Sequence, residues 1–201
     1  YKFNELNNEF KKKEEETAEK YGNNFGKYVK LHKSDNGNLS LIIASDNKIF
    51  MSKYSYESNE WNEELQLLCV YPENNFIVKI EMIKDFMTIG TFGGINMIYF
   101  DEKGFEAGSD YFNGIQYDYF SSSVIDNIHY LAVMSNRKDI DVFVSRDKKS
   151  WNHEKKYIVK ECNYVNLFSN NDRIFLTACD DLNIKIYLQN DQKKWENNYR
   201  Y

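Results

Sequence analysis

Short apolar runs, polar turns and alternating segments follow one another in a fixed order along most of the chain. The apolar runs cover residues 39–44, 86–91, 128–134 and 173–178, and the alternating segments after them cover 49–53, 95–99, 140–144 and 184–188. Alternation of apolar and polar residues is typical of a β-strand with one buried face. We therefore predict hairpins of antiparallel strands, with the apolar runs as the most buried strands.

A short segment that runs from an acidic residue to a large aromatic residue closes each of these units. The four pairs are Glu57 and Trp61, Asp101 and Phe105, Asp147 and Trp151, and Asp191 and Trp195, so the aromatic residues stand 44, 46 and 44 residues apart. All three tryptophans of the chain occupy this position. A unit of about 45 residues with four strands is typical of a β-propeller blade.

The repeat predicts an all-β fold, a β-propeller with four visible four-stranded blades. We place the blades at residues 27–71, 72–116, 117–160 and 161–201. Four blades can close a ring, or they can form part of a ring of six or seven blades that further sequence or a protein partner completes. Because the chain begins with Tyr1 rather than Met, we expect a processed or truncated piece.

Residues 1–26 lie outside the repeat and follow a helical pattern. Phe3, Leu6, Phe10 and Tyr21 recur near helical spacing among lysines and glutamates, and Gly22 is suited to a helix C-cap. We predict an amphipathic helix or arm that leads into the first blade. The charged run at 11–16 is interpreted as a solvated helix face, with a docking arm for a partner as the alternative.

The composition of the 201-residue chain fits a folded globular protein. Hydrophobic residues make up 42% and charged residues 28%, and no apolar run is long enough for a membrane helix. The net charge of −5 argues against sequence-independent binding of nucleic acid, which needs a basic face. We therefore expect neither a membrane span nor a nucleic-acid partner.

The third acid-to-aromatic segment resembles the Asp-box of sialidase-like propellers, whose short form reads Ser-x-Asp-Gly-x-x-Trp. Ser145, Asp147 and Trp151 match this motif, while Lys148 stands where the family has Gly. The resemblance implies a structural role, in which the carboxylate accepts backbone N–H bonds in the turn and the ring packs beneath it. We expect this role for all four pairs, although the other copies depart from the motif at Glu57, Phe105 and Gln189.

A second family is also similar to part of the chain. Residues 179–187 read Cys-Asp-Asp-Leu-Asn-Ile-Lys-Ile-Tyr, which resembles the WD40 phrase of Asp, two residues and Ile-Lys-Ile-Trp. The Gly-His pair of that family is missing from every unit. A WD40-type propeller is therefore the second choice.

The sialidase-like resemblance implies a hydrolytic site, but the chain does not supply its residues. That family holds the carboxylate of the sugar with three converging arginines, and this chain has four arginines in all, at Arg137, Arg146, Arg173 and Arg200. Three histidines lie far apart and at no metal-ligand spacing, namely His32, His129 and His153. We therefore predict no catalytic constellation, no metal site and no cofactor.

Two of the three cysteines, Cys162 and Cys179, flank a predicted hairpin turn at Asn170 and Asn171. A hairpin centred there would place the two thiols opposite each other. A disulfide is one interpretation, and two reduced thiols in neighbouring strands are the other. The odd number of cysteines favours the cytoplasm, whereas a disulfide would indicate a secreted or surface protein.

These features favour a non-enzymatic protein-binding scaffold or adhesion propeller that acts as a subunit of a larger complex. Propellers bind partners through loops. An aromatic cluster that could serve as the binding surface consists of Tyr111, Phe112, Tyr117, Tyr119 and Phe120, and the alternative is that these rings fill the space between blades. The other functions considered are a glycan-binding or sialidase-like glycoside hydrolase and an intracellular WD40-type assembly scaffold.

Overall fold

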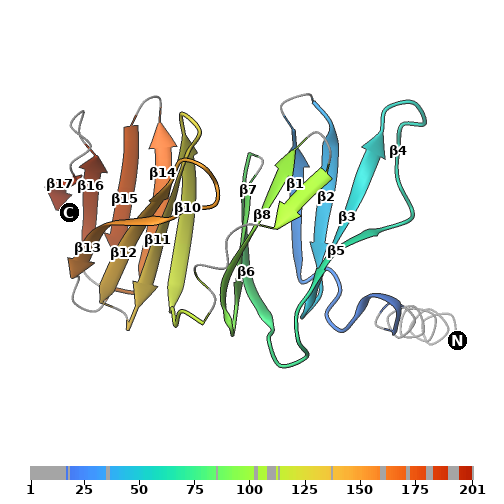
Figure 1. Ribbon diagram of the computed structural model, residues 1–201, viewed down its shortest axis with the longest axis horizontal. Helices are drawn as coiled ribbons and strands as arrows, with labels where there is room; N and C mark the ends of the chain where they lie inside the picture. Colours follow the sequence, from blue (N-terminus) through green and yellow to red (C-terminus); the bar gives the residue numbers. More distant parts are fainter. Residues whose placement is uncertain are drawn as a thin grey trace, which may run out of the picture. The chain divides into compact units, whose positions relative to one another are not determined.

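The computed structural model describes residues 17, 19–34, 37–84, 86–101, 104–107, 112, 114–136, 138–158, 162–170, 173–179, 183–189 and 195–200. This part of the chain is almost entirely β-structure (Figure 1), as the alternating pattern predicts. Residues 1–16 of the predicted N-terminal helix lie outside it. The described end of that segment is helical at Thr17 and from Glu19 to Tyr21, and it stops at Gly22, whose φ of 98° suits a helix C-cap.

The strands form four sheets in which most strands pair with their neighbours in sequence. Sheet 1 contains β1 (Tyr28–Lys33), β2 (Leu39–Ala44), β3 (Lys48–Ser55), β4 (Glu60–Trp61) and β5 (Gln66–Val70), and both β4 and β5 pair with β3. Sheet 2 contains β6 (Ile77–Ile83), β7 (Phe86–Thr91), β8 (Gly94–Asp101) and β9 (Gly104–Ala107).

The last two sheets repeat one strand order. Sheet 3 contains β10 (Tyr119–Ile125), β11 (Ile128–Ser135), β12 (Asp139–Ser145) and β13 (Asn152–Ile158). Sheet 4 contains β14 (Tyr164–Asn170), β15 (Arg173–Cys179), β16 (Ile184–Gln189) and β17 (Trp195–Arg200). In both sheets the strand pairs are antiparallel, and a bulge interrupts the pairing of the third strand with the fourth.

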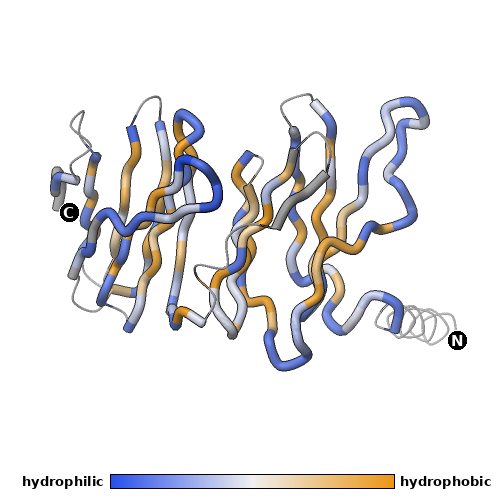
Figure 2. The backbone as a smooth tube through the Cα atoms, in the orientation of Figure 1, coloured by the Kyte–Doolittle hydropathy of each residue, from blue (hydrophilic) through white to orange (hydrophobic). Residues whose placement is uncertain are grey.

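The chain forms two compact units, Tyr1–Asp85 and Phe86–Tyr201, and the division falls in the turn between β6 and β7. No helix in the described residues is long and apolar enough to cross a membrane. Orange apolar segments run along the strands and blue polar segments lie mainly at the turns (Figure 2), which is the pattern from which the strands were predicted.

The first unit buries one face of sheet 1. Strand β2 alternates between half-buried and buried positions, with Ile42 and Ala44 on the buried face, and Ile49 and Met51 of β3 are buried as well. On the other face, the ring of Phe50 is covered by Tyr21 and Phe25, whose ring centroids lie 5.4 and 5.8 Å away. The segment before the first strand therefore shields part of a sheet face that is otherwise half-exposed.

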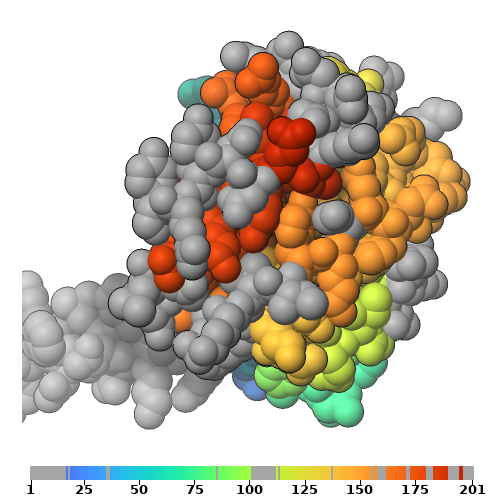
Figure 3. Space-filling view, turned by 90° about the vertical axis from the view of Figure 1, so that its left-hand side faces the viewer, coloured from blue at the N-terminus to red at the C-terminus, as the bar shows by residue number. Residues whose placement is uncertain are grey.

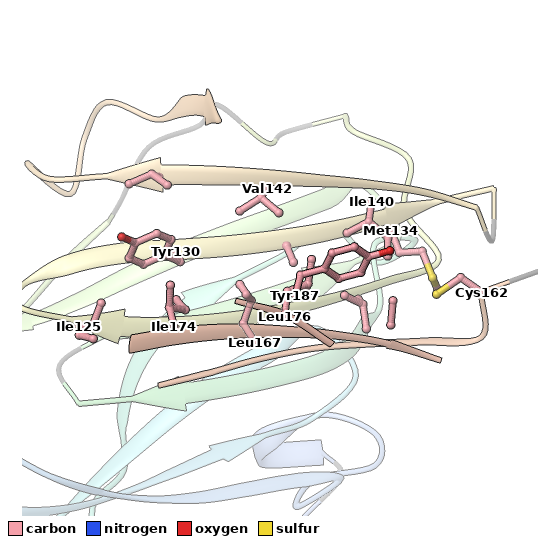
Figure 4. Packing of buried hydrophobic residues seen from close by; sticks show 14 residues of the cluster. Ile125, Tyr130, Met134, Ile140, Val142, Cys162, Leu167, Ile174, Leu176 and Tyr187 are labelled. Carbon is pink, nitrogen blue, oxygen red and sulfur yellow. The ribbon is translucent and has the colours of Figure 1, made fainter. Parts of the chain in front are cut away.

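The second unit is built on the face-to-face packing of sheets 3 and 4, whose residues run from yellow through orange to red in Figure 3. Alternate residues of both sheets meet in one apolar cluster (Figure 4). Sheet 3 contributes Ile125, Tyr130, Ala132, Met134, Ile140, Val142 and Val144. Sheet 4 contributes Val165, Leu167, Ile174, Leu176, Ala178 and Tyr187, and Cys162, which precedes β14, completes the cluster.

The two sheets differ in how many of their faces are covered. The inner strands of sheet 3 are buried on both faces, so that six consecutive residues of β11 are buried. Strand β15 of sheet 4 alternates, with Ile174, Leu176 and Ala178 buried and the residues between them only partly buried. Within the part of the chain that the structure describes, sheet 4 therefore has one covered face and one open face.

The hairpin that contains Cys179 differs in register from the predicted one. Its turn lies between Asn170 and Arg173, and Tyr164 rather than Cys162 stands opposite Cys179. A shift of one residue at the turn moves the facing residue by two positions. The thiol of Cys162 instead donates to the Tyr164 carbonyl at 3.3 Å, and the structure, which describes all three cysteines, joins none of them in a disulfide.

This register predicts three titratable thiols per chain. Protein purified without reductant and unfolded in guanidinium should react with DTNB at all three cysteines, because Cys162 and Cys179 do not face each other. A value of one thiol, restored to three by reduction, would show that two of the cysteines form a disulfide, and its assignment to Cys162 and Cys179 by peptide mapping would contradict this register.

Candidate functional site

Two of the five aromatic residues expected to bind a partner are core residues. Phe112 and Phe120 have no exposed surface. The ring of Phe112 packs edge-on against Phe143 and Trp151, at centroid distances of 5.0 and 5.4 Å. These two rings therefore cannot belong to an exposed binding surface, because other side chains enclose them. Tyr111 lies outside the described residues.

The two remaining tyrosines of this group are half-buried. The hydroxyl of Tyr117 donates to the Thr91 carbonyl at 3.0 Å, and its ring lies against Phe120. Tyr119 packs against the apolar cluster of sheets 3 and 4 and against Tyr164. A Cβ at Gly90 would lie 2.5 Å from both Phe120 and Tyr117, so the absence of a side chain at that position is what admits these rings.

The third acid-to-aromatic segment forms a tight turn. Oδ1 of Asp147 accepts hydrogen bonds from the backbone N–H groups of Lys149 (3.0 Å) and Ser150 (2.7 Å) and from the Ser145 hydroxyl (3.2 Å). These bonds, those from Ser150 first, hold the pKa of Asp147 well below its usual range. Trp151, which follows the turn, is buried.

Lys148 has a left-handed backbone conformation, with φ of 64°. Glycine is the residue that adopts this conformation without a steric cost, and glycine is what the resembled motif has here. The ammonium of Lys148 lies 5.4 Å from the centre of the Tyr99 ring.

The other three segments are less uniform. Trp61 is 37% exposed and touches Tyr54, and Glu57 is exposed and makes no hydrogen bond to the residues that the structure describes. Trp195 is partly buried beside Tyr157. The three tryptophans share one place, at or just before the fourth strand of a sheet. The remaining members of the predicted pairs lie outside the described part, namely Asp191 and the side chains of Asp101 and Phe105.

A histidine–carboxylate contact and an ion pair lie together on β12 and β13 of sheet 3. Nε2 of His153 is 2.8 Å from Oδ1 of Asp141, and Nζ of Lys156 is 3.1 Å from Oδ2 of Asp139. The side chains of His153 and Lys156 are 46% and 48% exposed, so solvent and small molecules reach both. This group, which we call the β12–β13 cluster, is the accessible acid–base constellation on which we base a function.

The strand pairing explains why these four residues meet. Asp139 and Asp141 are two positions apart on β12 and therefore point to the same face. Asp141 lies opposite Lys156 in the register, and the bulge between Val142 and Phe143 brings His153 onto the same face. The ring of His153 rests beside Phe143, with centroids 5.2 Å apart.

The two carboxylates of the cluster stabilise the charged form of Lys156. The hydrogen bond to Asp139, followed by the charges of Asp139 and Asp141, raises the pKa of Lys156, which therefore stays an ammonium group at neutral pH. The sequence had suggested no carboxylate partner for His153. Regular pairing of the segments 140–144 and 152–156, with Asp141 opposite Lys156, would have placed His153 opposite Val144 on the other face, so its contact with Asp141 depends on the bulge, which could not be foreseen.

The other groups with reactive chemistry are less suited to a site. His32 and His129 are buried, and His129 packs against the rings of Phe86 and Tyr99. Burial raises the pKa of the Cys69 thiol to about 11, so it is not a thiolate at neutral pH.

Neither the arginines that the structure describes nor its His, Cys, Asp and Glu side chains form a further candidate site. Arg173 is exposed at the start of β15, and Arg137 lies outside the described residues. Within the described part, no three His, Cys, Asp or Glu side chains are arranged to hold a metal ion.

A row of three hydrogen-bonded polar side chains connects sheets 3 and 4. The Tyr130 hydroxyl lies 3.0 Å from Oε1 of Gln189, whose Nε2 donates to Oε1 of Glu154 at 2.9 Å. Tyr130 is 3% exposed and Gln189 is 8% exposed, and burial, more than the nearby charge of Glu154, raises the pKa of Tyr130. Since substrate cannot reach these atoms, we interpret the three hydrogen-bonded side chains as a structural connection between the two sheets.

Comparison with known proteins gives a fold and no family. No family model matches the chain, and no curated protein matches it in sequence. The solved structures that match include a candidate 6-phosphogluconolactonase from Bacteroides uniformis, with a TM-score of 0.58 and 12% sequence identity. The match covers 87% of this chain and 55% of the other, so this chain spans about half the length of that protein. At this identity the likeness shows the fold alone.

This finding corrects the expected function. The sequence favoured a non-enzymatic binding scaffold, but the fold of this chain occurs in a structure that is named for an enzyme. The scaffold prediction is therefore contradicted. The expectation rested on the lack of a sialidase-type arginine triad and of metal-ligand spacing among the histidines, which excludes those two kinds of site and not others.

The burial of Phe120 predicts a large loss of stability on truncation. Phe120→Ala should lower the free energy of unfolding by about 3–5 kcal/mol, because it leaves a cavity in a closed apolar site. The matched control Phe92→Ala, at a ring that is 64% exposed, should change it by less than about 0.5 kcal/mol. Urea denaturation measures both values, and equal small effects would show that Phe120 is on the surface.

The hydrogen bonds to Asp147 predict a pH-dependent effect. Because folding lowers the pKa of this carboxyl, its contribution to stability is present above the unfolded-state pKa of about 3.9 and is lost as the pH falls below it. Asp147→Asn should therefore lower the melting temperature at pH 7, and the difference from the unaltered protein should shrink toward about pH 3.

Glu57→Gln is the control for this experiment, because Glu57 stands at the corresponding position of the first segment and is exposed. It should leave the melting curve unchanged at both pH values. A melting temperature of Asp147→Asn equal to that of the unaltered protein at pH 7 would contradict a structural role for the carboxylate.

Proposed function

We propose that this chain is part of a β-propeller hydrolase that opens small cyclic esters of sugar acids. The observation that carries the proposal is the 2.8 Å contact between His153 Nε2 and Asp141 Oδ1 on an accessible part of sheet 3. A histidine oriented by a carboxylate is a common means by which proteins activate water for attack on an ester carbonyl.

The strand order supports the propeller part of the proposal. The sheets are built from antiparallel strands in sequence order, and sheets 3 and 4 stack face to face through a continuous apolar cluster. Repeated four-stranded sheets are the construction principle of propeller blades. The similarity in fold to a candidate 6-phosphogluconolactonase supports a lactone as the substrate class.

Asp141 determines what His153 can do. If the imidazole donates its Nε2–H to Asp141, the lone pair of Nδ1 is left to accept a proton. The carboxylate also stabilises the imidazolium that forms when His153 takes a proton from water. The two residues can thus act together as the general base.

Lys156 supplies the positive charge of the proposed site. Asp139 and Asp141 keep it protonated, and it lies across the strand pair from Asp141. A fixed cation beside the reacting carbonyl stabilises the negative charge that develops on its oxygen, and it also attracts an anionic substituent such as a phosphate.

The proposed reaction consumes one water molecule. His153 accepts a proton from water as the water oxygen bonds to the carbonyl carbon of the lactone. The bond from that carbon to the ring oxygen then breaks, and the ring oxygen receives the proton from the imidazolium. The products are a carboxylic acid, which ionises, and a hydroxyl group on the same molecule.

Lactone hydrolysis measured at constant pH tests this function. The chain should accelerate the opening of 6-phosphogluconolactone or gluconolactone above the spontaneous rate. His153→Asn should lower kcat/KM by about 10²–10⁴-fold, because the general base is lost. Asp141→Asn should lower it by a smaller factor, and Lys156→Gln should weaken the reaction of the phosphorylated lactone more than that of the unphosphorylated one.

Lys149→Gln is the matched control, since Lys149 is an exposed lysine in the turn between β12 and β13 and lies outside the cluster. It should retain full activity. A rate equal to the spontaneous rate in the unaltered protein, or full activity in His153→Asn, would overturn the proposed function.

A further inference from the structure

We propose that Gln189 of sheet 4 is a positioning residue for the β12–β13 cluster, because its hydrogen bond to Glu154 keeps His153 beside Asp141 on the opposite face of sheet 3. The effect on catalysis rests on the proposed function, whereas the position of His153 can be measured without substrate.

Glu154 is the extra residue of the bulge between β12 and β13. Val142 pairs with Lys155 and Phe143 pairs with His153, so Glu154 has no pairing position opposite it on β12. One extra residue moves every side chain before it on β13 to the other face of the sheet. This is why His153 lies on the face that carries the cluster.

Glu154 points from sheet 3 toward sheet 4. Its Oε1 accepts a hydrogen bond from Nε2 of Gln189 at 2.9 Å, and the Tyr130 hydroxyl donates to Oε1 of the same amide at 3.0 Å. Tyr130 belongs to the apolar cluster between the two sheets (Figure 4). Because Tyr130 holds the oxygen of the amide, the nitrogen of Gln189 is directed at the half-buried carboxylate.

In a regular pairing of β12 with β13, two side chains would exchange faces. Glu154 would lie opposite Phe143, on the face that carries Lys156, and His153 would lie opposite Val144 on the face that meets sheet 4. The regular pairing would also complete the backbone ladder that the bulge interrupts. It would, however, separate His153 from its carboxylate partner in the cluster.

The carboxylate of Glu154 decides between these two registers. On the face of the cluster it would have water and the ammonium of Lys156, which is 48% exposed. On the face toward sheet 4 it loses water, and this loss is unfavourable unless a donor replaces the hydration. Nε2 of Gln189 is such a donor. We therefore expect the bulged register, and with it the position of His153, to depend on Gln189.

Sheet 1 shows that an apolar residue suits the corresponding place. The bulge between β3 and β5 leaves Leu68 as its extra residue, and Leu68 is buried. An apolar side chain needs no donor when it is buried, whereas the carboxylate in sheet 3 does. A leucine at position 154 should therefore keep the bulge and remove its dependence on Gln189.

Nuclear Overhauser spectroscopy of the histidine rings tests the position of His153. The chain has three histidines, and His153→Asn assigns the signals of His153 by removing them. In the unaltered protein this ring should show a contact with the ring of Phe143, since the two centroids lie 5.2 Å apart. Gln189→Leu should abolish the contact, because the carboxylate then loses its donor and turns to the other face.

A second substitution should rescue the first. Glu154→Leu by itself, and Glu154→Leu combined with Gln189→Leu, should both retain the contact between His153 and Phe143. Gln66→Leu, at an exposed glutamine of β5, is the matched control and should change nothing. Circular dichroism shows whether each variant is folded. Should Gln189→Leu not fold, the double variant still decides, because it is expected to fold and to retain the contact.

The lactone assay measures the consequence for catalysis. Gln189→Leu should lower kcat about 10–100-fold, because the general base is displaced from the attacking water. It should leave KM within about twofold, since Lys156 keeps its ion pair with Asp139. The double variant should regain most of the lost kcat. Loss of stability without displacement of His153 would not give this rescue.

Retention of the contact between His153 and Phe143 in folded Gln189→Leu, or its loss in Glu154→Leu or in the double variant, would overturn the proposal. Failure of the unaltered protein to hydrolyse a lactone would overturn the proposed function instead. The contact measured by NMR would still decide the role of Gln189.

Discussion

The packing of one β-sheet face on another is the interaction on which the second unit depends. Each strand of sheets 3 and 4 places alternate residues on opposite faces, so the apolar residues of a face are buried only where another part of the protein packs on it, and here each sheet covers a face of the other. The cluster from Ile125 to Tyr187 is the result, and it draws on the first three strands of both sheets. The open face of sheet 4 follows from the same rule, since no further sheet among the described residues covers it.

The arrangement also explains where accessible chemistry can lie. The inner strands β10 and β11 are enclosed, so a polar group there must be satisfied within the protein. Toward β12 and β13 the covering is incomplete, and Asp139, Asp141, His153 and Lys156 occupy that margin. The bulge at Val142 is the local feature that brings the histidine to the carboxylate, because without it the side chains would follow strict alternation.

The period-two pattern was enough to predict the strands, since burial of one face imposes it directly. It was not enough to predict how strands align. The hairpin between Cys162 and Cys179 turns one residue later than expected, because the local sequence offers several polar residues at which that turn could form. The pairing of His153 with Asp141 was missed for a related reason, since it depends on a bulge. Phe112 resembled a loop aromatic, but contacts with residues distant in sequence decide its burial.

The Tyr130, Gln189 and Glu154 chain has a consequence for how sheets 3 and 4 align. Apolar side chains tolerate small displacements against each other, because contact between methyl groups has little directional preference. Hydrogen bonds between β11, β16 and β13 do not, since sliding one sheet along the other would leave a buried amide or carboxylate without its partner. These directional hydrogen bonds thus favour one alignment of the two sheets. Other alignments would bury similar apolar areas but would break the hydrogen bonds.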